Sequence, residues 1–365
     1  MIKKKSPTSA DALIGLTKRE IQDFCVIRMI NAQLSGDWSR AGLEREASEA
    51  VADLLGRIPV GSYVPYDVLV HDQREVSSAT SPGLIGTDQQ PDSMIQVMRN
   101  ASITARLGAT LYPGLVGDAG IPRQEDASNA AWIDNETYSG TDKSSPTYSA
   151  LNLSPKTLRV RIDISRKMLK QSQPMIEGLL RDEISGAIGG GIDAAAIYGS
   201  GVAPIPQGIV GASGTNSVEI DTNGGSLDWS HLVLMESKLG NHQQLPGQAY
   251  VCNTGTLGAL KTTPRDTVGN VGGFLMADDG TVNGHPCLVS NTLPNDGTKG
   301  TGTDLSTMVF GAWSSLIVAL WGGLDLEADK VTLGERGGIV LRAFQDIDLG
   351  LRYPGAFTVV EDIVT

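Results

Sequence analysis

The chain has 365 residues, of which 40% are hydrophobic and 19% are charged, and these proportions exclude a wholly disordered protein. A net charge of −12, with Lys3–Lys5 as its only basic run, argues against a protein that binds nucleic acid mainly through phosphate contacts. Because the sequence has no 18-residue apolar run and no apolar leader core after Lys5, we expect a soluble cytoplasmic product without membrane contact.

The first 70 residues predict two helices within 17–56. Thr17 and Glu20 have the spacing of a capping box, and apolar residues recur at helical spacing up to Leu55. The composition then turns to Ser, Thr, Gly, Pro and Gln between 71 and 91. This stretch predicts a linker or an arm that lies on a neighbouring molecule.

The next part of the chain predicts a projecting β-hairpin. A short helix at 91–100 and strand-like residues at 103–111 precede a long polar stretch at 117–154. Apolar and polar residues then alternate strictly from Leu158 to Ile164, which predicts a strand with one buried face. Together the polar stretch and this strand indicate a hairpin that leaves the domain and returns.

Residues 172–199 form the longest predicted helix, with Pro174 in its first turn, where proline is tolerated. Glycines at 186, 189, 190 and 191 interrupt it, and each costs about 1 kcal/mol relative to alanine in a helix interior. This cost indicates either close packing against the helix, which is the simpler interpretation, or a hinge.

The remainder predicts a mixed domain followed by a return to strands. Helices are expected at 230–239 and 255–261, and strands at 248–251 and 285–289. Alternating and apolar residues between 347 and 360 predict further strands.

Catalytic and metal-binding patterns are absent from the sequence. Gly211–Gly214 lacks the last glycine of a nucleophile elbow, and Gly199–Gly201 lacks the third glycine of a dinucleotide-binding loop. No P-loop occurs. We therefore expect no catalytic residue, no cofactor and no metal, and a protein that is not an enzyme. The residues weighed and set aside are His71, His231, His242, His285, Cys25, Cys252, Cys287, Glu125–Asp126, Asp278–Asp279 and Glu361–Asp362.

A series of short motifs, in fixed order, spans about 130 residues. It consists of Ala79–Gly83, Met98–Asn100, Leu107–Ala109, Pro113–Leu115, Ile121–Arg123, Ala131–Trp132, Leu153–Lys156, Asp163–Arg166, Asp193, Gly199–Gly201 and Pro206–Ile209. The series resembles the major capsid proteins of tailed bacteriophages with the Hong Kong 97-type fold. The rest of the chain is similar to them in layout more than in motif.

The resemblance implies an α+β, Hong Kong 97-like capsid fold of four parts. They are an N-arm (71–95), an E-loop β-hairpin (122–160), a P-domain (96–121, 161–215 and 325–365) with the long helix as its spine, and an A-domain (216–324). Residues 1–70 depart from the pattern. They are a small scaffold-like segment, a part retained in the shell, or the remnant of a fusion between a protease and a capsid protein.

The implied function is that of a major capsid protein. It self-assembles into pentamers and hexamers and forms an icosahedral shell that encloses phage double-stranded DNA. Expected partners are further copies of the chain, a portal, a scaffold or maturation protease, and decoration proteins, with only non-specific contact to packaged DNA. The expected location is the virion of a phage or prophage, after assembly in the host bacterial cytoplasm. An encapsulin-like nanocompartment shell is the alternative of the same fold, and an acidic enzyme or a surface adhesin is the alternative of another class.

Two further expectations concern single residues. Some members of the family cross-link subunits through an E-loop lysine, and Lys143 is the candidate here, although no partner asparagine or assisting acid matches and a solvated lysine is the simpler interpretation. Shells of this family expand as DNA enters, and Gly189, Gly190 and Gly191 are a candidate hinge that lets the spine helix bend in the precursor and straighten later.

Overall fold

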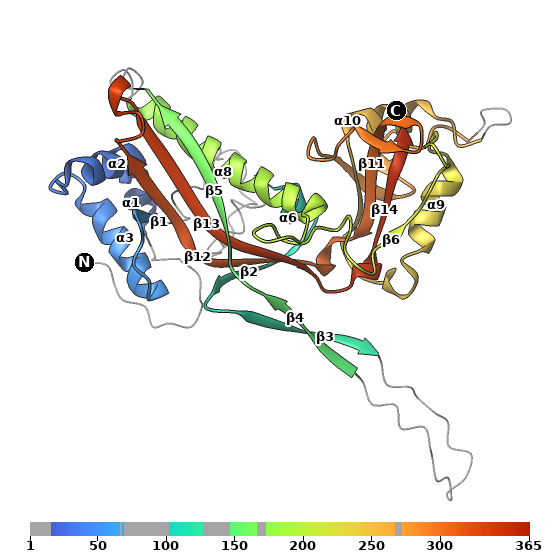
Figure 1. The fold of residues 1–365 in the computed structure, drawn as a ribbon, viewed down its shortest axis with the longest axis horizontal. Coiled ribbons are helices and arrows are strands. Elements are labelled where there is room, and N and C mark those ends of the chain that lie inside the picture. The colour runs from blue at the N-terminus through green and yellow to red at the C-terminus, as the bar shows by residue number, and fades with distance from the viewer. Residues whose placement is uncertain (1–15, 66–67, 69–101, 127–146, 166–172, 267–271) are drawn as a thin grey trace, which may run out of the picture.

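The computed structural model describes residues 16–65, 68, 102–126, 147–165, 173–266 and 272–365. The molecule has two sheets at its two ends, long strands that run between them, and a two-stranded ribbon that projects from the middle (Figure 1). Its helices are α1 (Lys18–Asp23), α2 (Val26–Ser35), α3 (Gly42–Leu55), α6 (Ile103–Arg106), α8 (Gln173–Tyr198), α9 (Trp229–Ser237) and α10 (Thr254–Thr262), with 3-10 turns η1 (Gly240–His242), η2 (Trp313–Ser315), η3 (Gly334–Arg336) and η4 (Pro354–Ala356).

The five-stranded sheet has the order β1-β12-β13-β5, and β2 pairs beside β1 along the same edge of β12. Alternate residues of β12 face different cores: Leu316, Val318 and Leu320 face one, and Ile317 and Ala319 face the other. Because both faces are covered, the strand is an almost continuous apolar run. The strands are β1 (Ser62–Val64), β2 (Thr110–Leu115), β5 (Lys156–Ile164), β12 (Leu316–Asp329) and β13 (Ile339–Leu351).

The seven-stranded sheet has the order β6-β14-β11-β7-β9-β8, with β10 beside β11. One face packs in a cluster of its own that includes Leu232, Tyr250 and Phe310, and the other face shares a cluster with the five-stranded sheet through residues such as Val251 and Val309. The chain passes directly from one sheet to the other at two points. Only η2 joins β11 to β12, and only the turn that contains η4 joins β13 to β14. The strands are β6 (Asn216–Ser217), β7 (Gln248–Cys252), β8 (Thr281–Val282), β9 (His285–Val289), β10 (Gly297–Lys299), β11 (Gly302–Ala312) and β14 (Phe357–Val364).

The N-terminal helices cover the five-stranded sheet next to α8 (Figure 1). The capping box predicted at Thr17 and Glu20 is present in α1. The structure has three helices within 17–56, where the sequence predicts two. The helix is interrupted because the backbone is extended at Phe24 and the N–H of Cys25 donates to the buried Glu44 carboxylate (3.0 Å).

Several further elements agree with the sequence, and two more differ. The long helix, the strand at 158–164, the helix at 255–261 and the strands at 248–251 and 285–289 are present. Residues 103–106 are helical rather than strand-like, because the Ser102 hydroxyl caps them. Residues 156–164 are not the returning strand of a hairpin: β5 pairs with β13 in the five-stranded sheet.

The domain limits expected from the resemblance do not follow the sheets. The boundary between 324 and 325 lies inside β12. The last strand, β14, was expected with the P-domain, but it pairs with β11 in the seven-stranded sheet. The reason is that the chain crosses from one sheet to the other at η2 and again at η4, so that neither sheet is built from one continuous stretch.

In the described ranges, no helix is long and apolar enough to cross a membrane.

Candidate assembly surfaces

The ribbon of β3 (Ala119–Asp126) and β4 (Thr147–Leu153) projects away from both sheets (Figure 1). The two strands pair only with each other among the described residues. Most of β4 is solvent-exposed, including Tyr148 at 66% exposure, and it becomes buried only at Leu153. A single two-stranded hairpin is marginally stable in water. The exposed part of this ribbon is therefore a candidate assembly surface.

The root of the ribbon, in contrast, is firmly held. Ile121 and Leu153 pack with Trp321 in a small core, and the Trp321 indole donates to the carbonyl of Gly117 (2.6 Å). Between β4 and β5, the buried Asp348 accepts hydrogen bonds from the Ser154 N–H (2.9 Å) and from the Lys156 ammonium (2.6 Å). The ribbon is thus a rigidly mounted extension of the five-stranded sheet.

Asp348 is a functional residue that the sequence pattern concealed. It alternates with Ile347 and Leu349, so the period of two places it on the exposed face of a strand. Only 3% of it is exposed, because the root of the ribbon folds over that face. The acid between the apolar residues Ile347 and Leu349, together with Lys156 after a turn, is the available signal.

The spine helix α8 carries two anchors for the segment that precedes it in the chain. The Arg181 guanidinium donates to the carbonyl of Val68 (2.9 Å). Twelve residues further along α8, the buried Asp193 accepts from the hydroxyl and N–H groups around Ser102 and Thr104, at 2.6 to 3.0 Å. Val68 and Ser102, which border the span 69–101 on either side, are thus both bonded to the same helix.

The candidate hinge residues Gly189, Gly190 and Gly191 lie between these anchors, in an unbroken stretch of α8. A Cβ atom at Gly186 or Gly190 would meet no atom within 4 Å. At Gly191 it would lie 3.1 Å from the Leu158 side chain, and Gly189 is buried. Close packing within the subunit therefore accounts for Gly191 but not for Gly186 or Gly190.

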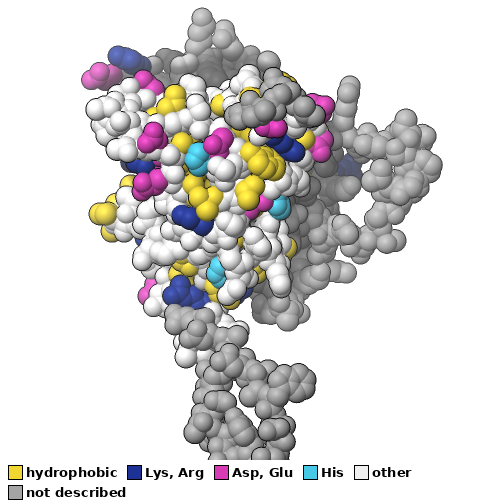
Figure 2. Space-filling view, turned by 90° about the vertical axis from the view of Figure 1, so that its right-hand side faces the viewer, with side chains coloured by type: hydrophobic (Ala, Val, Ile, Leu, Met, Phe, Trp, Pro, Cys, Tyr) yellow, Lys and Arg dark blue, Asp and Glu magenta, His cyan; other side chains and the backbone are white. Residues whose placement is uncertain are grey.

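The face at the end of the seven-stranded sheet carries apolar side chains among acidic, basic and histidine side chains (Figure 2). Exposed apolar residues of this part of the chain include Val233 and Leu234 on α9, each 42% exposed, and Phe274, 53% exposed. Scattered exposed apolar residues are normal on a soluble protein, so exposure alone does not define an interface here.

Two of the three cysteines, which are far apart in sequence, are in contact. The Sγ atoms of Cys252 on β7 and Cys287 on β9 are 3.6 Å apart. The hydrogen bond with Cys287 and burial raise the pKa of the Cys252 thiol, which disfavours the reactive thiolate. In the strand register Cys287 pairs with Tyr250, two residues before Cys252, and this diagonal offset is longer than a disulfide normally spans.

The structure brings together no set of predicted metal ligands. Among the described residues, no group of three or more His, Cys, Asp or Glu side chains could hold a metal ion. His231 caps α9, His242 stacks on Tyr353, and His285 packs edge-on against Phe310. Lys143, His71 and the whole expected N-arm (71–95) lie outside the described residues.

Solved capsid structures have the same fold. The capsid of an empty GTA particle covers 80% of this chain and all of its own length, with a TM-score of 0.58 and 17% identity. The structure from Gordonia phage Cozz covers 72% of this chain and 87% of its own, with a TM-score of 0.53 and 20% identity. The α+β, Hong Kong 97-like fold expected from the sequence is thereby confirmed.

A curated relative is the major capsid protein of Halomonas phage phiHAP-1, 32% identical over 356 residues, which are 96% of this chain. The chain spans 56% of the length of that relative. The model of the phage capsid family matches residues 84–362, about three quarters of the chain. The chain therefore belongs to the phage capsid family.

Proposed function

We propose that this chain is a major capsid protein that self-assembles into pentamers and hexamers and forms an icosahedral shell around phage double-stranded DNA. Membership of the phage capsid family supports this function. The observation that carries it is the projecting β3–β4 ribbon, which is mounted on a buried root but has no cover of its own. A row of subunits that overlap one another supplies that cover.

The proposed role is structural, without catalysis, and its place is the virion. The subunit's main partners are further copies of itself. A portal, a scaffold or maturation protease, and decoration proteins complete the proposed set. Packaged DNA is contacted only non-specifically, in keeping with a net charge of −12, because an acidic wall repels phosphates.

The sheets support revised limits for the proposed domains. The P-domain comprises the five-stranded sheet with α8, and the A-domain comprises 216–312 together with β14. The E-loop is the ribbon from Ala119 to Leu153, and β5 belongs to the P-domain. The N-arm is the span whose two ends are anchored on α8 at Arg181 and Asp193.

The glycines of the spine helix support a proposed coupling between helix and arm. Gly186 and Gly190 lie between the two arm anchors and face open space, so the helix bears their cost without gaining packing inside the subunit. A bend at Gly189–Gly191 would change the separation of the anchors. Bending of the spine and movement of the arm are then one event.

Gly190→Ala tests the hinge. The added methyl group meets no atom within 4 Å, so the variant should fold and be slightly more stable, by up to about 1 kcal/mol. Gly258→Ala on α10, also without a neighbour within 4 Å, is the matched control. We expect Gly190→Ala alone to change precursor assembly or shell expansion. Wild-type assembly and expansion in Gly190→Ala would refute the hinge.

We also propose that Lys143, in the E-loop, forms a covalent cross-link to a neighbouring subunit. Heating assembled particles in denaturing gel buffer tests it directly. A ladder of multimers that collapses to one band in Lys143→Arg supports the cross-link, and a single monomer band from the unmodified chain excludes it.

Electron microscopy of the purified protein in negative stain tests the proposed function itself. Closed shells, or rings with five- and six-fold symmetry, are expected. Stable monomers at high concentration contradict it. Particles that contain protein cargo in place of DNA would instead indicate a nanocompartment shell.

A further inference from the structure

The N-terminal segment of residues 16–64, here named the N-terminal clasp, is built into the core of the subunit. It supplies nine of the seventeen buried residues in one of the main hydrophobic clusters. The remainder comes from α8, β12, β13 and their neighbours. The nine are Phe24, Val26, Ile27, Met29, Ile30, Ala47, Val51, Tyr63 and Val64.

Loss of the clasp would uncover the apolar face on which it packs. Leu180 and Ile184 of α8 and Leu324 and Leu326 of β12 are each at most 1% exposed, and all four belong to this shared cluster. A contiguous apolar patch of this kind on a soluble protein promotes association or aggregation. The face is therefore suited to permanent cover.

The clasp also closes an edge of the five-stranded sheet. Strand β2 pairs with β12 from Ile317 to Trp321, and β1 continues along the same edge from Leu324 to Leu326. Unpaired strand edges are sites of unwanted pairing between molecules. By covering the end of this edge, the clasp prevents β12 from pairing with another copy.

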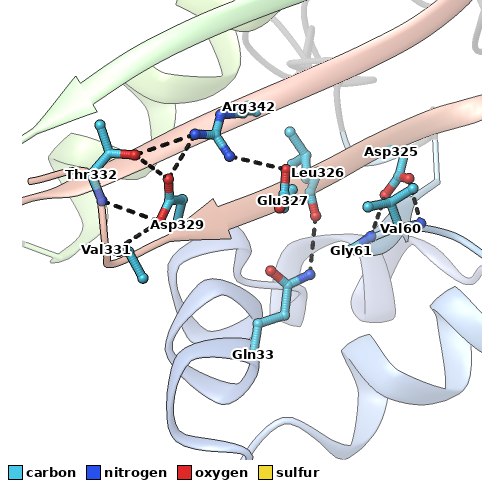
Figure 3. A network of polar contacts seen from close by, with 10 residues as sticks. All are labelled: Gln33, Val60, Gly61, Asp325, Leu326, Glu327, Asp329, Val331, Thr332 and Arg342. Carbon is cyan, nitrogen blue, oxygen red and sulfur yellow. Dashed lines mark hydrogen bonds and ion pairs between the residues drawn. The ribbon is translucent and has the colours of Figure 1, made fainter.

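Polar contacts fix the clasp to β12 at defined points (Figure 3). The Asp325 carboxylate accepts from the N–H groups of Val60 (2.8 Å) and Gly61 (3.1 Å). The Gln33 side-chain amide donates to the carbonyl of Leu326 (3.0 Å), and the Lys330 ammonium to that of Leu34. Burial raises the pKa of Asp325, although the two backbone donors favour its ionised form.

Gly61 shows how closely the clasp approaches the sheet. A Cβ atom at this position would lie 2.1 Å from the carbonyl oxygen of Leu326. Only glycine permits this approach, since the atom in the way belongs to the backbone of β12. The contact is thus specific to a docked clasp.

We propose that the N-terminal clasp stays bound to its own subunit through assembly and remains in the finished shell. Any maturation cut that releases a scaffold then falls outside residues 16–64. This inference rests on the proposed shell function, because a finished shell is where retention matters. It favours a retained segment over a removable scaffold for the part of residues 1–70 that the structure describes.

A nick in the clasp tests its attachment without any need for assembly. Ile58 is 93% exposed, so a protease recognition sequence inserted between Arg57 and Ile58 is accessible. After the cut, the fragment that ends at Arg57 should co-elute with the rest of the chain in native gel filtration and separate only in denaturant. Separation in native buffer from a remainder that stays folded would overturn the inference.

Gly61→Ala compared with Gly42→Ala gives the matched pair of variants. Gly42 belongs to the same clasp, and a Cβ there meets no atom within 4 Å. We expect trypsin to cut the clasp of Gly61→Ala about tenfold faster or more, because proteolysis follows the population of the opened state. Equal rates of trypsin cleavage in the two variants would count against docking of the clasp through Gly61.

Intact-mass measurement on assembled particles completes the test. Particles that contain residues 16–64, within the subunit or as a bound fragment, are expected, and particles from which these residues are missing would refute retention. If no particles form, the shell function fails, while the nicking result still decides whether the clasp is attached.

Discussion

The N-terminal clasp and the β3–β4 ribbon are both attached to the five-stranded sheet, but the side chains of the clasp are largely buried and those of the outer ribbon are exposed. The clasp buries its apolar residues on its own subunit, with Met29 and Val51 at 0% exposure. The ribbon is buried only at its root, and Tyr148 near the start of β4 is 66% exposed.

This difference separates stability from assembly. Burial within the subunit stabilises the folded chain before any partner is present. Apolar surface that stays exposed in the subunit contributes to stability only when a neighbouring subunit covers it and removes it from water. Changes in the clasp should therefore alter unfolding, and changes in the outer ribbon should alter association.

The largest expected effect is that of Ile30→Ala in the clasp. Ile30 is 1% exposed and packs in the cluster shared with β12. Its truncation should lower the free energy of unfolding by about 2–5 kcal/mol. Chemical denaturation of the unassembled subunit measures this, with Asn31→Ala on the exposed side of α2 as the control. A loss no greater than that of Asn31→Ala would show that the clasp is not part of the core.

A smaller loss is expected from Asp348→Ala at the root of the ribbon. The change removes the acceptor for the N–H groups of Ser154 and of the buried Leu349, as well as the partner of Lys156. A buried group left unpaired costs about 1–3 kcal/mol. Asp346→Ala, which loses only the exposed contact with Thr157, should cost less. The same denaturation experiment compares them. Equal losses in the two variants would mean that the root is not anchored through Asp348.

Tyr148→Ala on the outer ribbon should leave the subunit's free energy of unfolding within about 0.5 kcal/mol of the original. Its effect should appear in assembly, as a higher subunit concentration needed for particles in light scattering. Tyr148→Phe, which keeps the ring, should assemble more nearly as the unchanged chain does. If Tyr148→Ala lowered the free energy of unfolding and left assembly unchanged, the outer ribbon would serve the stability of the subunit and not its assembly.

The smallest expected effect is a pH dependence at the end of β12. The Thr332 hydroxyl, followed by the Val331 N–H, lowers the pKa of Asp329 from 3.8 to about 2. Because the folded pKa is below the unfolded value, this stabilisation is present above about pH 4 and is lost as the pH falls toward 2. Thermal unfolding of Asp329→Asn should depend less on pH in that window. If the pH dependence of thermal unfolding were unchanged in Asp329→Asn, Asp329 would not be its source.

Local patterns predicted the single elements of the fold well. The strict alternation from Leu158 to Ile164 identified β5, and Thr17 with Glu20 identified the start of α1. Such signals act within a few residues and do not depend on distant partners. The motif series, through its resemblance, predicted the capsid fold and family, which the comparisons confirm.

Pairing between distant segments could not be predicted in the same way. The alternation at β5 does not reveal that its partner is β13, so the sequence alone indicates a hairpin where the structure has a sheet strand. Burial of Asp348 and Glu44 depends on elements that fold over them, against the usual exposure of acids. The docking of the clasp rests on Gly61 and Asp325, which are 264 positions apart in the chain.

Hydrogen–deuterium exchange on unassembled subunits and on particles tests the contrast between clasp and ribbon most directly. The amides of α2 and α3 should be protected in both forms. The amides in the outer, exposed parts of β3 and β4 should exchange quickly in the subunit and become protected only in particles, since a lone hairpin opens easily. Ribbon amides protected in the isolated subunit, or clasp amides protected only in particles, would contradict it.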